Sequence, residues 1–123
     1  MGRGEQFEDL VVWQRSMALL VKIYGICRKT PLAKDWGLRD QLQRAAVSVP
    51  ANIAEGYERN SRKEYIQFIN VAKGSVGELR CLPRITFLLQ YVLEETATEL
   101  IEESAHVARM LKGLANSLKR AQA

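Results

Sequence analysis

The stretch Ser48-Val-Pro-Ala-Asn-Ile-Ala-Glu-Gly-Tyr57 decides the fold, because a proline stands inside an unbroken helical periodicity. Apolar residues recur at steps of three and four from Leu38 to Tyr57, and this period passes straight through Pro50. An interior proline removes one backbone hydrogen bond and clashes with the preceding turn, at a cost of about 3 kcal/mol. We therefore expect either one long helix kinked at Pro50 or a helix that breaks there and restarts with Ser48 as its cap. The unbroken period favours the kink.

The segment before this stretch predicts a separate helix over about residues 10–29. Asp9 can cap its start, and Thr30-Pro31 ends it because the residue before a proline is pushed out of the α region. Asp35 can then cap the helix that contains Pro50.

The segment after the stretch predicts two further helices. Ser61-Arg-Lys-Glu64 has the spacing of a capping box, and the helix that starts there should bend at Pro83 and end near residue 90 or 93. The last helix follows Leu93, with glutamates in its first turns and Lys and Arg in its last turns, which suits the helix dipole. No period-two alternation and no Asn-Gly or Asp-Gly hairpin signal competes with this pattern.

Four helices with short connections predict an all-α fold, an up-and-down antiparallel four-helix bundle. The bundle should occupy residues 7–119, with a disordered N-terminus at 1–6 and a frayed C-terminus at 120–123.

The first helix carries two apolar bands, roughly a quarter to a third of a turn apart. One band, which we expect to face the core, contains Trp13, Met17, Leu20, Val21, Tyr24 and Cys27. The other contains Val12, Leu19, Ile23 and Ile26. Either the two bands form one wide stripe on a central helix, or the second band covers an oligomer interface.

Composition excludes several classes of function. Apolar residues make up 47% of the chain and no run is long enough to span a membrane, so we expect a soluble cytoplasmic protein with no membrane partner. Cys27 and Cys81 both fall at apolar positions of helices, which predicts reduced core thiols. A single histidine, His106, makes a zinc site or a histidine-based dyad hard to build. We therefore expect neither an enzyme nor a bound cofactor or metal.

Positive charge is concentrated on particular helix faces. The net charge is +4, and residues 61–92 hold five basic and two acidic residues. The cations that share a face with others of their helix are Arg15 and Lys22 on the first helix and Arg62, Lys73, Arg80 and Arg84 on the third. Such stripes are typical of a surface that binds RNA or DNA phosphates. A solvated face, or pairing with acidic residues of another subunit, would give the same pattern.

These residues resemble the four-helix-bundle family encoded in intervening sequences of bacterial 23S rRNA genes, which includes the accessory variability determinant of diversity-generating retroelements. The resemblance covers about residues 7–118. It is carried by Phe7-Glu-Asp-Leu10 with Trp13, Gly37-Leu38, Gln41-Leu42-x-Arg44-Ala45-Ala46, Ser48-Val-Pro-Ala-Asn52-Ile-Ala-Glu-Gly56, Phe68-Ile-x-x-Ala72-Lys-Gly-Ser75 and Glu78-Leu79.

The resemblance implies a homopentameric ring with a non-enzymatic role connected with nucleic acid. In the retroelement members the ring binds a reverse transcriptase and template RNA through basic surface. An alternative is therefore an interaction scaffold for a protein such as a reverse transcriptase, without direct nucleic-acid binding. The segment Cys81-Leu-Pro83-Arg departs from the family pattern and puts the straightness of the third helix in question.

The motif residues that carry over by position are taken as structural. They are Ser48, Pro50, Asn52, Glu55, Gly56, Gly74 and Ser75. We expect Asn52 and Glu55 to cap or bridge near the kink, and Gly74 to allow a neighbouring helix to approach.

Overall fold

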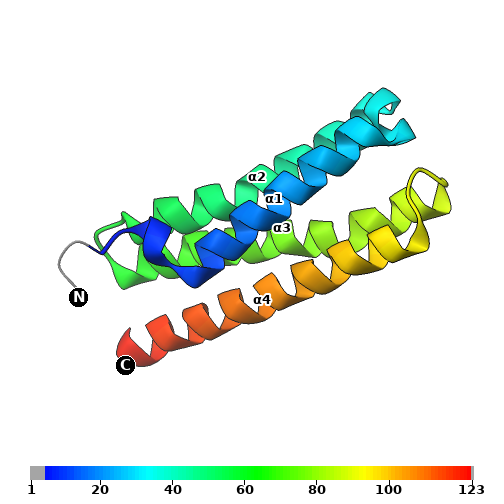
Figure 1. Cartoon of the computed structure of the whole chain (residues 1–123). Helices are drawn as coiled ribbons and strands as arrows, with labels where there is room; N and C mark the ends of the chain where they lie inside the picture. Colours follow the sequence, from blue (N-terminus) through cyan, green and yellow to red (C-terminus); the bar gives the residue numbers. More distant parts are fainter. Residues whose placement is uncertain (1–4, 123) are drawn as a thin grey trace.

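The computed structural model describes residues 5–122, and four long helices account for most of them (Figure 1). They are α1 (Val11–Lys29), α2 (Trp36–Tyr57), α3 (Arg62–Leu88) and α4 (Glu94–Gln122). Two short 3-10 helices, η1 (Phe7–Asp9) and η2 (Pro31–Lys34), precede α1 and α2. No strand occurs within residues 5–122, so the predicted all-α four-helix bundle is confirmed. None of these helices is long and apolar enough to cross a membrane.

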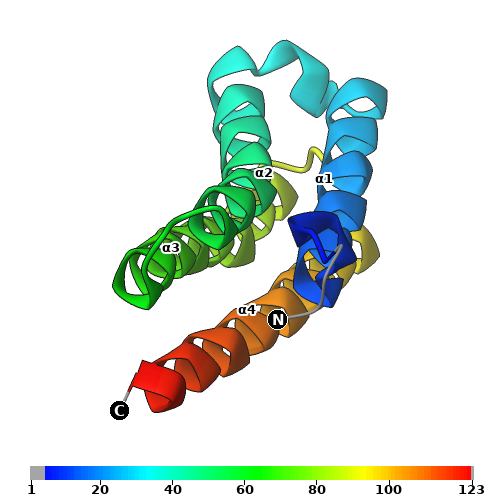
Figure 2. The ribbon, with the colours of Figure 1, turned by 90° about the vertical axis from the view of Figure 1, so that its left-hand side faces the viewer.

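Consecutive helices run antiparallel. The α1–α2 and α3–α4 connections lie at one end of the bundle, here called the connection end, and the α2–α3 turn lies at the other (Figure 1). Figure 2 shows α3 between α2 and α4. Helix α3 packs extensively against both of these neighbours, whereas α1 touches α4 over a smaller region. The side of α3 that faces neither neighbour is left on the outside of the molecule.

Two of the three predicted caps are confirmed. The Asp35 carboxylate accepts the backbone N–H of Leu38 at 3.2 Å, and the Ser61 hydroxyl oxygen accepts that of Glu64 at 3.1 Å. Asp9 was predicted wrongly, because it lies in η1, where its carboxylate accepts the backbone N–H of Gln6 at 3.0 Å. An extended residue, Leu10, separates it from α1.

Helices α2 and α3 continue without a break through Pro50 and Pro83, and both prolines are buried. Ser48 therefore lies inside α2, and the alternative in which a new helix restarts there is wrong. Apolar residues before and after Pro50, such as Ala46 and Ile53, are fully buried on one side of α2. Burial of that continuous stripe offsets the hydrogen bond that the proline removes.

The helix ends differ slightly from the prediction. Helix α3 ends at Leu88, before the predicted residue 90 or 93, and Gln90 follows with φ 64°, the only positive φ among the described non-glycine residues. Helix α4 extends to Gln122, beyond the predicted bundle limit at residue 119. Glu5 and Gln6 are exposed, and Gln6 forms part of the cap of η1. Residues 1–4 and 123, which belong to the predicted disordered and frayed ends, lie outside the described residues.

The core takes the band of α1 that was predicted as an oligomer interface. Val12, Leu19 and Ile23 are only 6%, 3% and 1% exposed, because α2 and α4 close over this side of α1. The interface prediction is therefore wrong for these three residues. Ile26 is half-buried and packs against the same core.

The band of α1 that was predicted to face the core lies mostly at its edge. Met17 and Tyr24 are half-buried, Val21 is 64% exposed, and Cys27 is buried. Trp13 packs on the core from the side and meets the Phe7 ring edge-on at 5.5 Å. Leu20 also packs against the core, so the inward parts of both bands join in one wide stripe, as the alternative interpretation of the two bands predicted.

Candidate nucleic-acid interface

The four predicted cations of α3 lie along one side of that helix without a counter-ion. Arg62, Arg80 and Arg84 are exposed and Lys73 is half-buried. None of the four forms an ion pair or a side-chain hydrogen bond with another described residue. Their charge is therefore available to an anionic partner.

The two predicted cations of α1 are arranged differently. Arg15 lies 3.6 Å from a carboxylate oxygen of Glu103, and Lys22 lies 3.6 Å from one of Glu99, both on α4. These half-exposed pairs contribute little to stability, but they neutralise the charge of α1 locally. The structure thus distinguishes the two cations of α1, which lie beside carboxylates, from the four of α3, which form no ion pair with a described residue.

On the outward face of α3, the space beside two glycines is empty. A Cβ atom added at Gly74 or Gly77 would meet nothing within 4 Å, and Cys81 on the same face is exposed. Gly74 therefore does not serve the approach of a helix within the protomer, and the prediction for it is wrong. Cys81 was expected in the core, but its position falls on the side of α3 that neither α2 nor α4 covers.

The close helix approach occurs at Gly56 instead. A Cβ atom there would lie 2.9 Å from the Cβ of Phe68 and 3.2 Å from the backbone oxygen of Tyr65. Gly56 is buried in α2 and thus allows α3 to approach closely. Burial raises the pKa of the Tyr65 hydroxyl to about 12, with smaller contributions from Tyr57 and Glu5. Tyr65 and Tyr57 are both half-buried at this end of the contact between α2 and α3.

A small polar network joins the same two helices nearer their middle. The Ser75 hydroxyl donates to that of Ser48 at 2.7 Å. The Asn52 amide donates to the backbone oxygen of Ser48 at 2.8 Å and to its hydroxyl at 3.0 Å. Asn52 therefore bridges the turn that contains Pro50, and the network satisfies polar groups that would be costly to bury unpaired.

Helix α4 separates its charges along its length. Its glutamates all fall within residues 94–103, and its cations, Arg109, Lys112, Lys119 and Arg120, all follow. Antiparallel packing brings the basic half of α4 to the same end of the bundle as Arg62 and Lys63 of α3 (Figure 1). The glutamates and the cations of residues 93–123 nearly cancel in the net charge of that segment. This second basic region is therefore recognised only from the order of the charged residues along α4.

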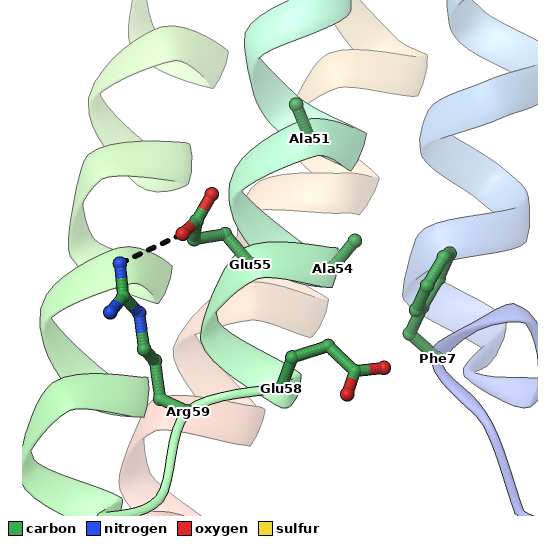
Figure 3. Close-up of a pocket in the computed structure, with 6 residues that line it drawn as sticks. All are labelled: Phe7, Ala51, Ala54, Glu55, Glu58 and Arg59. Carbon is green, nitrogen blue, oxygen red and sulfur yellow. Dashed lines mark hydrogen bonds and ion pairs between the residues drawn. The ribbon is translucent and has the colours of Figure 1, made fainter.

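A shallow depression lies over the outer surface of the motif, between η1 and the end of α2 (Figure 3). It is lined by Phe7, Ala51, Ala54, Glu55, Glu58 and Arg59. Arg59 donates to the Glu55 carboxylate at 2.8 Å, and its guanidinium lies 4.7 Å from the centre of the Phe68 ring. These contacts hold the α2–α3 turn against α3, which gives Glu55 a structural role.

The described residues contain no constellation typical of catalysis. No group of three or more His, Cys, Asp or Glu side chains within residues 5–122 is placed to hold a metal ion. Cys27 is buried, and burial raises the pKa of its thiol despite the opposing effect of Arg39 and Arg28, which makes it a poor nucleophile. His106 is half-buried, with one ring nitrogen 3.4 Å from the guanidinium of Arg109.

Comparisons with known proteins agree with this architecture. A family model described as 23S rRNA-intervening sequence protein matches residues 8–113. A crystal structure from Bacteroides thetaiotaomicron, of a protein of unknown function in the S23 ribosomal protein family, matches with a TM-score of 0.78 at 21% identity. The match covers 85% of this chain and 98% of that one, and at this identity it shows the fold alone. No curated protein matches.

Proposed function

This chain belongs to the 23S rRNA-intervening sequence protein family, and we propose that it is a non-catalytic, oligomeric protein of the cytoplasm that binds nucleic acid through the basic side of α3. RNA is the favoured ligand, because the retroelement members of the family that the sequence resembles bind template RNA through basic surface. The proposed phosphate-binding residues are Arg62, Lys73, Arg80 and Arg84.

The observation that carries this proposal is the contrast between the two basic helices. Carboxylates of α4 lie beside Arg15 and Lys22 of α1, whereas the cations of α3 have no carboxylate partner within residues 5–122. Neutralising a phosphate releases condensed counter-ions, which favours binding by cations that are not already paired.

The bare outward face beside these cations supports contact with a nucleic-acid backbone. Gly74 and Gly77 carry no side chain, and nothing else fills the space above them. A sugar-phosphate strand could therefore approach the helix closely while Lys73 and Arg80 reach its phosphates. Aromatic side chains for base stacking are scarce on this side of α3, which favours recognition of shape over sequence.

The proposed oligomer is a ring of five subunits, as the family resemblance implies. The edge band of α1 is the best candidate for a subunit contact, because Met17, Tyr24 and the largely exposed Val21 are not enclosed by the protomer. Changing Val21→Glu should convert the oligomer to a monomer in analytical ultracentrifugation without unfolding it. Val47→Glu on α2, also an exposed valine, is the matched control and should leave the oligomer intact. An oligomer unaffected by Val21→Glu would place the contact elsewhere.

The binding proposal is tested by titrating a structured RNA and a matched duplex DNA across a series of salt concentrations. The variant Lys73→Gln with Arg80→Gln should weaken RNA binding by about tenfold or more and lower the salt slope by roughly 1.5, because two phosphate contacts are lost. The matched control, Arg15→Gln with Lys22→Gln, removes the same charge from α1 and should change both quantities much less.

Equal losses in the two double variants would mean that overall charge, and not the side of α3, governs binding. Absence of binding at low salt would favour the alternative, a scaffold for a protein such as a reverse transcriptase. Absence of catalysis is part of the proposal.

A further inference from the structure

The connection end of the bundle exposes more large apolar side chains than the rest of its described surface. Trp36 at the start of α2 is 70% exposed, and Leu93 before α4 is also 70% exposed. Between them, Phe87 and Leu89 are 38% and 49% exposed, and Leu88 reaches 76%. Apolar side chains gathered in this way on a surface loop are typical of an interaction site.

Two shallow hollows lie at the connection end, and Tyr91 lines both of them. The first is lined by Thr30, Phe87, Gln90, Tyr91, Val92, Leu93, Glu94 and Thr96. The second is lined by Pro31, Lys34, Asp35, Trp36 and Tyr91. They therefore form one interrupted groove that runs from the α3–α4 connection to the α1–α2 connection.

The groove is held in shape by a hydrogen bond between the two connections. The Tyr91 hydroxyl donates to one carboxylate oxygen of Asp35 at 2.8 Å, while the other oxygen caps α2 at Leu38. This bond to Asp35, with burial as a smaller cause, raises the pKa of Tyr91. Because the connections are tied together before any ligand arrives, little conformational entropy would be lost on binding.

The two hollows differ in the charge that they leave free, because the Asp35 carboxylate beside Lys34 already accepts hydrogen bonds from Tyr91 and from the backbone of Leu38. Lys34 lies in one hollow and Glu94 in the other, and neither forms an ion pair with a described residue. A ligand with an anion at one end and a cation at the other would complement both.

We propose that this groove binds a short, extended, apolar segment of a partner protein, with an acidic residue beside Lys34 and a basic residue beside Glu94. Alternate side chains of an extended segment point to the same face, which suits two hollows separated by the Tyr91 ring. The two hollows together are lined by 12 residues, fewer than the roughly 20–30 that each partner contributes to a standard stable interface. A short segment therefore fits this surface better than a second folded copy of the chain.

Panning a random peptide library against the full-length protein tests this proposal. The enriched peptides should share an apolar centre flanked by an acidic residue at one end and a basic residue at the other. Trp36→Ser with Leu93→Ser should weaken their binding by about tenfold or more, since exposed aromatic anchors dominate such contacts. Both residues are highly exposed and stand at helix starts, where serine is well tolerated, so the variant should fold.

Two further variants sharpen the result. Val47→Ser with Val71→Ser removes exposed apolar side chains of α2 and α3 outside the groove and should leave peptide binding unchanged. Lys34→Glu should reverse the preference at its end of the groove from acidic to basic peptides. The proposal is overturned if no peptide is enriched, or if enriched peptides bind the Trp36 and Leu93 variant equally well. It is also overturned if that variant changes the oligomeric state, because the end would then contact a second copy.

Discussion

Gly56 stands one residue before the end of α2 and Gly74 stands near the middle of α3, and the tertiary structure surrounds the two glycines in opposite ways. Gly56 of α2 is buried against Phe68 and Tyr65 of α3, with no room for a methyl group. Gly74 of α3 has open space where its side chain would be. The first glycine is explained by packing within the chain, and the second is not. Glycine in an exposed helix costs about 1 kcal/mol relative to alanine, and packing within the described residues does not offset this cost at position 74.

The same contrast separates the two sides of α3 as a whole. Towards α2, the helix contributes buried residues such as Ala72 and Leu79 and the hydroxyl of Ser75, which Ser48 satisfies. Away from its neighbours, it presents glycines and Cys81 beside unpaired cations. Inner packing thus determines stability, while the outward side is available for a partner.

Changing Gly56→Ala should have the largest effect on this comparison. The new Cβ atom would lie 3.0 Å from a ring carbon of Tyr65 and closer still to Phe68, so α2 and α3 must move apart. Overpacking of this kind costs about 1–3 kcal/mol, only partly offset by the better helix propensity of alanine. We expect the free energy of unfolding to fall by about 1–2 kcal/mol in urea denaturation. An unchanged or raised free energy of unfolding would show that α2 and α3 can accommodate the added methyl group without loss of packing.

Alkaline titration should show how well the contact between α2 and α3 beside Gly56 excludes water. The folded protein holds the proton of Tyr65 up to a pKa of about 12, above the ordinary tyrosine value of 10.0 in the unfolded chain. Stability is therefore fully present below pH 10 and is lost as the pH rises towards 12, by about 1–2 kcal/mol. Tyr65→Phe should remove most of this loss when unfolding is followed by circular dichroism. A loss that persists in this variant would have to come from other tyrosines or lysines.

Changing Gly74→Ala should have the smallest effect on stability and the opposite sign. The added methyl group meets nothing, so the helix should gain about 0.5–1 kcal/mol from the higher propensity of alanine. If a nucleic-acid backbone approaches α3 at this face, the same variant should bind RNA more weakly despite its higher stability. If Gly74→Ala raised both the stability and the RNA affinity, nucleic-acid binding would not require the glycine.

Helix positions could be predicted from the sequence because they depend on local chemistry. Asp35 and Ser61 cap helices through their own side chains, and the period through Pro50 needed no tertiary information. The inward band of α1 could not be predicted, because both bands are apolar and the choice depends on where α2 and α4 pack.

The candidate site was predictable only in part for a similar reason. All six cations could be found from their spacing, but their availability depends on which helix lies opposite. Glu99 and Glu103 are more than 75 residues from Lys22 and Arg15 in the sequence, so only the packing of α4 on α1 reveals the ion pairs.

By itself, then, the sequence determined the four helices, most of their starting residues and their connections, since capping, proline chemistry and apolar period act within a few residues. The tertiary structure alone decided which band of α1 is buried, which glycine allows close packing and which cations remain unpaired. It also brought Trp36, Tyr91 and Leu93 together at the connection end. Each of these outcomes depends on a neighbour that is distant in the sequence, and no local pattern encodes such a neighbour.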